Sequence, residues 1–262
     1  MRNTQYAPMW NILSASATGT SHVKNNTPCQ DAHRWTLMET GTLLIAVADG
    51  AGSAERSQAG AVCAVEIAIT FMEGALVAVI PDDEAGWERL LTEAFKQARA
   101  AIFALADADN LSPRDFACTL TLAIANHEWL VTGQIGDGVV VAQTLSGELI
   151  TVAPPQRGEY ANETHFLIAD DALSEFDGRI YRQDETIECI SALAVMTDGL
   201  LRLALDLTED RPHAPFFNPL LNFAANPDNP KEAREQLRAF LDSPRVNART
   251  DDDKTLVLAA RV

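Results

Sequence analysis

The feature that most constrains this chain is an apolar run that ends in a carboxylate. Residues 43–48 are all apolar, and Asp49-Gly50-Ala51-Gly52-Ser53 follows them directly. A short apolar run predicts a buried strand, so Asp49 stands at the end of a rigid element. The glycines allow a sharp turn and a close approach of the backbone to a bound group. A carboxylate here favours a metal ion over a phosphate, because it repels phosphate unless a cation lies between them.

The same arrangement recurs along the chain, which sets it apart from an ordinary Asp-Gly turn. Two further apolar runs end at Gly136-Asp137-Gly138 and at Thr197-Asp198-Gly199. Asp31 precedes another strand, and the acidic stretch 251–253 leads into the last one. Hard oxygen ligands that converge from several strands favour Mg²⁺ or Mn²⁺. The pattern therefore predicts a site for divalent cations built from carboxylates.

Length and charge limit the classes of protein. The chain has 262 residues, of which 47% are hydrophobic, and this is enough for a sizeable core. Its formal net charge is -17. Such a surface repels nucleic acid and anionic membranes, so we expect neither as a partner. We expect a monomer.

The cysteines and the N-terminal residues indicate the compartment. The four cysteines lie far apart: Cys29, Cys63, Cys118 and Cys189. This spacing is typical of neither a zinc site nor a disulfide framework, and it predicts reduced thiols. Residues 1–5 lack the apolar core of a signal peptide. We expect a cytoplasmic protein, in which the apolar stretch 59–80 is a partly buried helix and not a membrane span.

The order of predicted elements indicates the fold class. Strands are expected at 10–17, 32–38, 42–48, 118–125, 129–134, 139–143, 148–152, 192–196 and 255–260, with short ones at 166–168 and 185–189. Helices are expected at 57–80, 84–108, 200–207 and 230–241. Polar stretches at 22–30 and 154–164 are expected to be loops, and 211–230 to wrap the surface. Without strict βαβ alternation, this order predicts an α+β protein with mainly antiparallel strands. Because the chain contains no linker or repeat, we expect a single domain over 1–262.

The strand pairing also predicts which acids meet. If 32–38 and 42–48 form a hairpin, then Asp31 and Asp49 lie at the same end of it. The first and last strands are expected to pair in the core. Asp251 and Asp253 are expected to be exposed companions of Asp252.

The ordered motifs resemble those of the metal-dependent protein phosphatase 2C family. The resemblance rests on Cys29-Gln30-Asp31-Ala32, the stretch 48–52, Ile135-Gly136-Asp137, the stretch 197–199 and the stretch 252–255. It covers nearly the whole chain and is nearest to the bacterial branch with Asp-Gly-Ala-Gly-Ser after the strand. It implies a four-layer sandwich, in which two central antiparallel sheets are flanked by helix pairs.

The resemblance also implies an activity and its cofactors. Members of the family hydrolyse phosphoserine and phosphothreonine in proteins, by a hydroxide that bridges two Mn²⁺ or Mg²⁺ ions. By position, Asp49 would bridge the ions and the Gly50 carbonyl would bind one of them. Asp198 and Asp252 would hold the other, and Asp31 would hold an ion directly or through water. Asp137 would join Asp198 at a third, weaker site.

Two departures from the family pattern concern the catalytic groups. The family's phosphate-binding arginine corresponds to Asn26, so we expect Lys24 or Arg34 to supply the positive charge. The histidine that follows Asp-Gly in some members is Ala51 here. His22 and His33, which flank Asp31, are candidates for the general acid, and a metal-bound water is the other candidate.

Two alternative functions follow from these departures. The chain could be a catalytically weak module that binds phosphoproteins, or a metallohydrolase of small phosphoesters. Retained carboxylates argue against the first, because burial of several carboxylates without cations is costly. The expected partners are phosphorylated proteins, the substrates of a serine/threonine kinase.

Overall fold

Two five-stranded antiparallel sheets form the centre of the protein, which is described here as a computed structural model over residues 9–157 and 164–262. The first sheet has the order β1-β12-β9-β6-β7. Its strands are β1 (Trp10–Ala17), β12 (Lys254–Arg261), β9 (Ile190–Met196), β6 (Val139–Thr144) and β7 (Leu149–Ala153). The first and last strands thus pair in this sheet, as predicted, with Trp10 opposite Arg261.

The second sheet has the order β2-β3-β4-β5-β8. Its strands are β2 (Ala32–Leu37), β3 (Leu43–Ala48), β4 (Leu120–Ala125), β5 (Trp129–Ile135) and β8 (Asp177–Arg182). The predicted hairpin is confirmed, because β2 and β3 pair with Ala32 opposite Ala48. The central strands β3, β4 and β5 are buried along their whole length. Both faces of these strands are buried, one against the other sheet and one against helices, and β3 accordingly has an unbroken apolar sequence.

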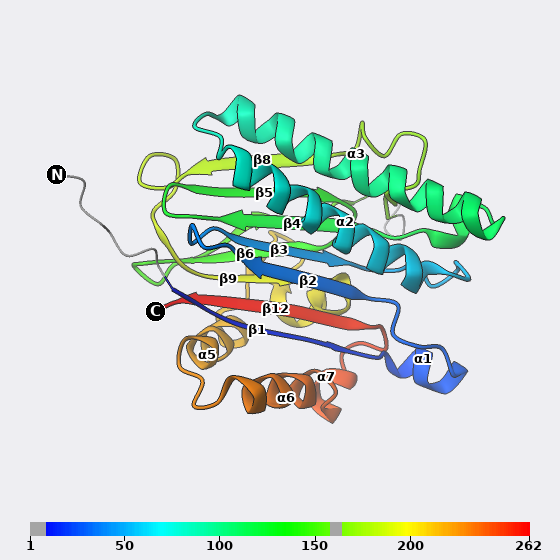
Figure 1. The fold of residues 1–262 in the computed structure, drawn as a ribbon. Helices are drawn as coiled ribbons and strands as arrows, with labels where there is room; N and C mark the ends of the chain where they lie inside the picture. Colours follow the sequence, from blue (N-terminus) through cyan, green and yellow to red (C-terminus); the bar gives the residue numbers. More distant parts are fainter. Residues whose placement is uncertain (1–8, 158–163) are drawn as a thin grey trace.

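Helices cover the outer face of each sheet, which completes the four layers (Figure 1). The long helices α2 (Ser57–Ala78) and α3 (Glu84–Asp109) pack together over the second sheet. The first sheet is covered by α5 (Ala214–Ala225) and α6 (Pro230–Leu241), with α4 (Leu201–Ala204) and α7 (Pro244–Asn247) beside them. A short helix α1 (Thr20–Asn25) follows β1. The α+β sandwich predicted from the sequence is confirmed.

Several predicted segments differ from the structure. The stretch expected as a loop at 22–30 begins inside α1, and the stretch expected to wrap the surface at 211–230 contains α5. Burial of Phe216 and Phe217 against the first sheet stabilises α5 despite its internal proline. The predicted short strands at 166–168 and 185–189 are turns or isolated bridges, and the edge strand is β8. The polar sequence of β8, with only half-buried side chains, concealed it from pattern analysis.

Smaller elements connect these layers. A 3₁₀ turn at Asp198–Leu200 leads into α4, which is shorter than the predicted helix and is followed by the two-stranded pair β10 (Leu205–Asp206) and β11 (Arg211–Pro212). Another 3₁₀ turn, Pro113–Phe116, precedes β4. By length and composition α2 could cross a membrane. In this fold, however, its buried side packs on the second sheet and on α3, as the sequence predicted for a partly buried helix.

Candidate active site

Carboxylates from both sheets meet at one end of the sandwich, on the right in Figure 1. Asp49 follows β3 and Asp31 precedes β2, and the hairpin register places these two residues side by side. In the first sheet, the end of β9 lies next to the start of β12 and the start of β6, since Met196 is opposite Leu256 and Val139. Asp198, Asp252 and Asp137 flank these strand ends. Antiparallel pairing thus brings together acids that are far apart in the sequence.

The side chains of these acids converge. Asp49, Asp137 and Asp198 each offer one oxygen, and the three oxygens lie within 4.8 Å of one another. Asp31 lies near enough to Asp49 for the two carboxylates to affect each other's pKa, and it accepts a hydrogen bond from Thr197 Oγ1 at 2.7 Å. Asp252 lies near enough for its charge to act on Asp49, Asp137 and Asp198. The structure therefore gathers all five predicted acids in one place.

Burial and mutual repulsion make these carboxylates reluctant to ionise in the absence of a cation. Burial, aided by the charge of Asp253, raises the pKa of Asp31 to about 7. Burial, together with the charges of Asp137, Asp252 and Asp31, raises the pKa of Asp198 to about 8. The pKa values of Asp49 and Asp137 are also raised, mainly by burial. A cluster of this kind is stabilised by a positive charge at its centre.

The unsatisfied oxygens fit a divalent cation. Oδ1 of Asp31 and Oδ1 of Asp137 are buried, and neither has a hydrogen-bond partner among the residues described. Buried carboxylate oxygens without donors are rare because they lose the solvation of water. An ion that prefers hard oxygen ligands, such as Mg²⁺ or Mn²⁺, would satisfy them. The residues present therefore fit the predicted metal site.

Two glycines permit the segments to approach one another. A Cβ on Gly199 would lie 1.9 Å from the carbonyl oxygen of Asp253, so Asp198-Gly199 packs directly on the chain that carries Asp252. A Cβ on Gly50 would lie 2.7 Å from the carbonyl oxygen of Gln30. The Asp-Gly pairs of the sequence thus serve close packing of backbone around the acids.

Asp253 was expected to be exposed, and this prediction was wrong. Its side chain is 1% exposed and accepts hydrogen bonds from the backbone N–H groups of Gly19, at 2.6 Å, and Gln30, at 2.5 Å. His22 Nδ1 forms a third hydrogen bond with it at 2.9 Å. The backbone donors after β1 and before β2 need an acceptor there, so the carboxylate is turned inward. Asp253 thereby ties α1 and the Asp31 segment to the start of β12.

Comparisons with known proteins agree with this geometry. The model of the family described as Protein phosphatase 2C matches residues 18–242. Serine/threonine-protein phosphatase 3 of Escherichia coli (strain K12) is 38% identical over an alignment 262 residues long, and the alignment covers 95% of this chain and 98% of that protein. The chain belongs to the protein phosphatase 2C family. This phosphatase is therefore a phosphoric ester hydrolase of a metal-dependent family.

Solved structures show the same fold at low sequence identity. Serine/threonine phosphatase Stp1 from Staphylococcus aureus superposes with a TM-score of 0.63 at 15% identity, covering 99% of this chain and 98% of that one. PppA of Pseudomonas aeruginosa superposes with a TM-score of 0.60 at 15% identity, covering 98% of this chain and all of the other. The four-layer sandwich is thus shared by proteins whose sequences have diverged widely.

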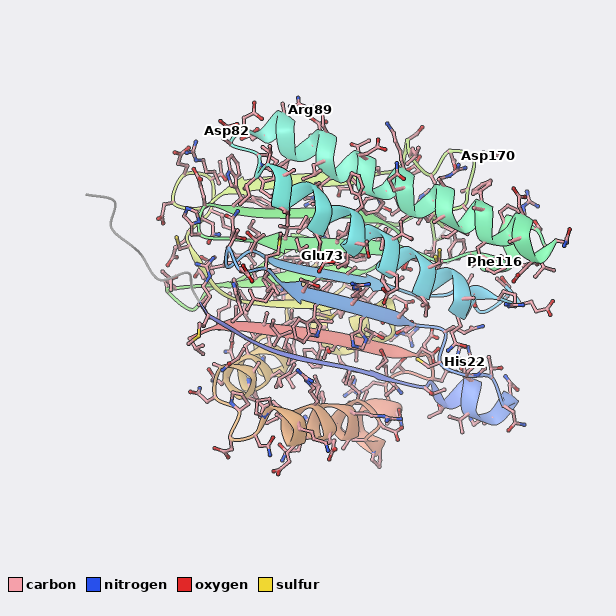
Figure 2. The ribbon with its side chains drawn as sticks, viewed as in Figure 1. His22, Glu73, Asp82, Arg89, Phe116 and Asp170 are labelled. Atoms are coloured by element: carbon pink, nitrogen blue, oxygen red, sulfur yellow. The ribbon has the colours of Figure 1, made fainter. Side chains whose placement is uncertain are left out.

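The two candidate histidines of the phosphatase lie in different environments. Figure 2 shows His22 on α1, at the end of the molecule where β2 begins. Its side chain is 15% exposed, and its Nε2 atom would lie 4.0 Å from a Cβ on Gly52, so it faces the loop after Asp49. His33 lies on β2, where its Nδ1 is 3.0 Å from Ser16 Oγ, and burial lowers its pKa. Only His22 borders the Asp49 loop through a ring nitrogen without a hydrogen-bond partner in the described part of the chain.

The two candidate phosphate-binding residues also differ. Arg34 projects toward α2, where it pairs with Glu66 and with Glu73, the latter at 3.6 Å. Arg34 lies three positions after Asp31, a distance of roughly 10 Å along an extended strand. Lys24 is exposed on α1, the helix that also carries His22. The structure therefore does not bring Arg34 to the acids, whereas Lys24 stays a prediction.

The sequence patterns did not indicate three functional candidates, which are Thr197, Arg56 and Asp253. Thr197 Oγ1 donates to Asp31 and accepts from the backbone N–H of Thr255 at 3.0 Å, so it joins β9 and β12 to the acid before β2. Arg56 is the residue immediately before α2, and together with Gln30 it lines a hollow of about 460 Å³. Thr197 and Asp253 stand inside the quoted motifs, and Arg56 follows the Asp49–Ser53 loop by three residues. Their proximity in sequence to the motifs was the available signal.

Proposed function

We propose that this phosphatase dephosphorylates serine and threonine residues in proteins, the substrates of a partner kinase, with Mn²⁺ or Mg²⁺ as cofactor. The observation that carries the proposal is the half-buried triad of Asp49, Asp137 and Asp198, in which one oxygen of each lies within 4.8 Å of the others. The name of the Escherichia coli relative supports the substrate class, since that protein is called a serine/threonine-protein phosphatase. Asp31, Asp49, Asp137, Asp198 and Asp252, with the Gly50 carbonyl, would hold the ions.

Divalent cations bound by these acids would lower the pKa of a water molecule and offset the charge that gathers on the phosphoryl oxygens. The protein contributes the orientation of the acids. Thr197 fixes one oxygen of Asp31 and leaves the other, Oδ1, without a protein donor. Gly199 and Asp253 hold the Asp198 and Asp252 segments against each other. These contacts preorganise the acids before an ion or substrate arrives.

His22 is our candidate for the proton donor to the leaving oxygen of serine or threonine. When the P–O bond breaks, the proton on Nε2 would pass to that oxygen, while Asp253 holds Nδ1. An aliphatic alkoxide needs this proton, but nitrophenolate does not. We therefore expect His22→Ala to lower kcat for a phosphothreonine peptide by roughly 100-fold and to lower turnover of p-nitrophenyl phosphate far less. Equal losses on both substrates would assign His22 a purely structural role.

Arg56 and Lys24 are our candidates for recognition of the phosphate. Arg56 is 45% exposed, pairs with Asp109 at 3.2 Å and lies over the Phe116 ring, so its guanidinium is preordered beside the hollow that Gln30 lines. Its planar fork suits a phosphate better than a lysine does. We expect Arg56→Ala to raise KM for a phosphothreonine peptide roughly tenfold. Arg56→Lys is expected to have a KM close to that of the alanine variant. Lys24→Ala is expected to raise KM less than Arg56→Ala does. Unchanged KM in both alanine variants would exclude the two residues from phosphate binding.

The proposal is tested by phosphate release from phosphothreonine and phosphoserine peptides with Mn²⁺, with Mg²⁺ and with a chelator. We expect turnover that requires metal and is restored when metal is added back. The ratio of kcat/KM for the peptide to that for p-nitrophenyl phosphate distinguishes a protein phosphatase from a hydrolase of small phosphoesters. Folded protein that binds the phosphopeptide but releases no phosphate with any metal would instead be the catalytically weak binding module.

A further inference from the structure

A second cavity lies outside the carboxylate cluster, on the face of the first sheet that carries α4–α7. Its volume is about 880 Å³. Buried or half-buried apolar side chains line it, among them Phe216, Leu220, Phe240 and Val246. These come from α5, α6 and α7, and residues of α4, β10 and β11 complete the lining. Pockets of this size and apolar character are typical of binding sites.

Arginines surround this apolar lining. Exposed side chains of Arg202, Arg211, Arg245 and Arg249 border the cavity, and Asp206 is the acidic residue among its lining. Arg211 pairs with Glu209 at 2.7 Å and with Asp206 at 3.8 Å. In the described part of the chain, the other three arginines form no ion pair and no side-chain hydrogen bond. The cavity is therefore apolar inside and positively charged at its rim.

The charge of the rim is opposite to that of the whole protein. The chain has 37 acidic and 20 basic residues, so an arginine placed at random would meet a carboxylate more often than another cation. Three unpaired guanidinium groups around one hollow repel each other unless an anion joins them. The net charge of -17 also repels acidic phosphoproteins, and a local positive site would counter this repulsion at the point of contact.

Two arginines that line the cavity are close in sequence to acids of the candidate active site. Arg202 follows Asp198 by four residues, or about one helical turn, through the 3₁₀ turn and α4. Arg249 precedes Asp252 by three residues. A ligand seated in the cavity would thus contact the same segments that carry two of the metal-binding acids.

We propose that this cavity is a docking site for an acidic segment of the phosphoprotein substrate, with a bulky apolar side chain that enters between α5, α6 and α7. The proposal rests on the proposed function. The arginines bind the carboxylates of the segment, and Phe216, Leu220 and Phe240 contact its apolar residue. The docking segment lies outside the phosphorylated residue itself, so it determines which proteins the phosphatase selects.

Direct binding tests the cavity without catalysis. The probe is a fluorescein-labelled, unphosphorylated peptide in which glutamates flank a Leu-Phe pair. The double variant Arg202→Glu/Arg245→Glu is compared with Arg89→Glu/Lys96→Glu on α3, which changes the net charge equally on the opposite helix layer (Figure 2). We expect fluorescence anisotropy to show binding that weakens about tenfold or more in the first variant and little in the second. Equal weakening in both, or no binding to wild type, would overturn the docking site.

Kinetics separates the docking site from the activity. A phosphothreonine peptide with the glutamate-flanked Leu-Phe extension is compared with the same peptide without it. We expect the extension to lower KM for wild type and to lose this advantage in Arg202→Glu/Arg245→Glu. If no phosphopeptide is hydrolysed but the labelled peptide binds, the proposed function fails and the docking site stands. If decyl phosphate, a small amphiphilic anion, binds at the cavity and the peptide does not, the proposed docking site is wrong.

Discussion

Asp49→Asn is expected to abolish metal-dependent turnover while it stabilises the metal-free protein. Asp49 lies within 4.8 Å of Asp137 and Asp198 through one oxygen of each, and the charge of Asp31 acts on it. The amide has the same shape but no negative charge, so it holds a cation weakly. We expect kcat to fall at least roughly a thousandfold, which is about 4 kcal/mol of transition-state stabilisation. Phosphate release from a phosphothreonine peptide measures this loss.

The same change removes one of several buried charges that repel each other. The melting temperature of the chelated Asp49→Asn protein is therefore expected to rise by roughly 5 °C. Asp82→Asn is the matched control, because this exposed acid lies in the turn between α2 and α3, far from His22 in Figure 2. It is expected to leave both quantities as in wild type. Loss of activity with a lower melting temperature would indicate a damaged fold and not a lost ligand.

The second large effect is the dependence of stability on pH and metal. In the unfolded chain, aspartates titrate near pH 4, whereas in the folded, metal-free protein the pKa of Asp31 is about 7 and that of Asp198 about 8. Between these limits the folded state binds more protons than the unfolded state. The free energy of unfolding therefore falls as pH rises. The stabilisation that Asp31 and Asp198 contribute to the free energy of unfolding is fully present below pH 4 and is lost by about pH 8.

Thermal melts of the chelated protein from pH 5 to pH 8 measure this slope. We expect the melting temperature to decrease across the range, and saturating Mn²⁺ or Mg²⁺ to remove most of the decrease, because a cation binds the deprotonated cluster. Metal at 100 times its dissociation constant stabilises by about 2.7 kcal/mol, or roughly 5–10 °C for a chain of this size. Asp49→Asn should show a shallower slope. A melting temperature that is independent of pH and of metal would contradict the buried carboxylate cluster.

The local sequence pattern was sufficient to predict helices and strands that are long or fully buried. The apolar run 43–48, the amphipathic repeat of 84–108 and the runs that end at Asp137 and Asp198 all appear in the structure near their predicted positions. Pattern was insufficient where burial depends on partners far away in sequence. The edge strand β8 pairs on one side only and has a polar sequence, and α5 is stabilised by Phe216 and Phe217 against the first sheet.

The same division applies to the candidate site. Each acid at a strand end was visible in the sequence, and the order of the motifs indicated that they form one site. The orientation of neighbouring side chains was not visible. Asp253 is buried because its oxygens form hydrogen bonds with two backbone N–H groups and with His22. Arg34 is turned away from the acids by its ion pairs with two glutamates of α2. Arg56 and Thr197 acquire a role only through neighbours brought by other strands and loops.

The sequence by itself determined which groups supply the chemistry of this protein: carboxylates at the ends of buried strands, flanked by glycines, which predict a site for divalent cations. These properties are local, because a strand and the acid that ends it are contiguous in the chain. Only the tertiary structure decided which acids share one centre, which positively charged side chains lie near that centre and where a second, arginine-rimmed cavity lies. Those properties depend on strand register and helix packing, which join residues that are far apart in the chain, such as Gly19 and Asp253, separated by 234 positions.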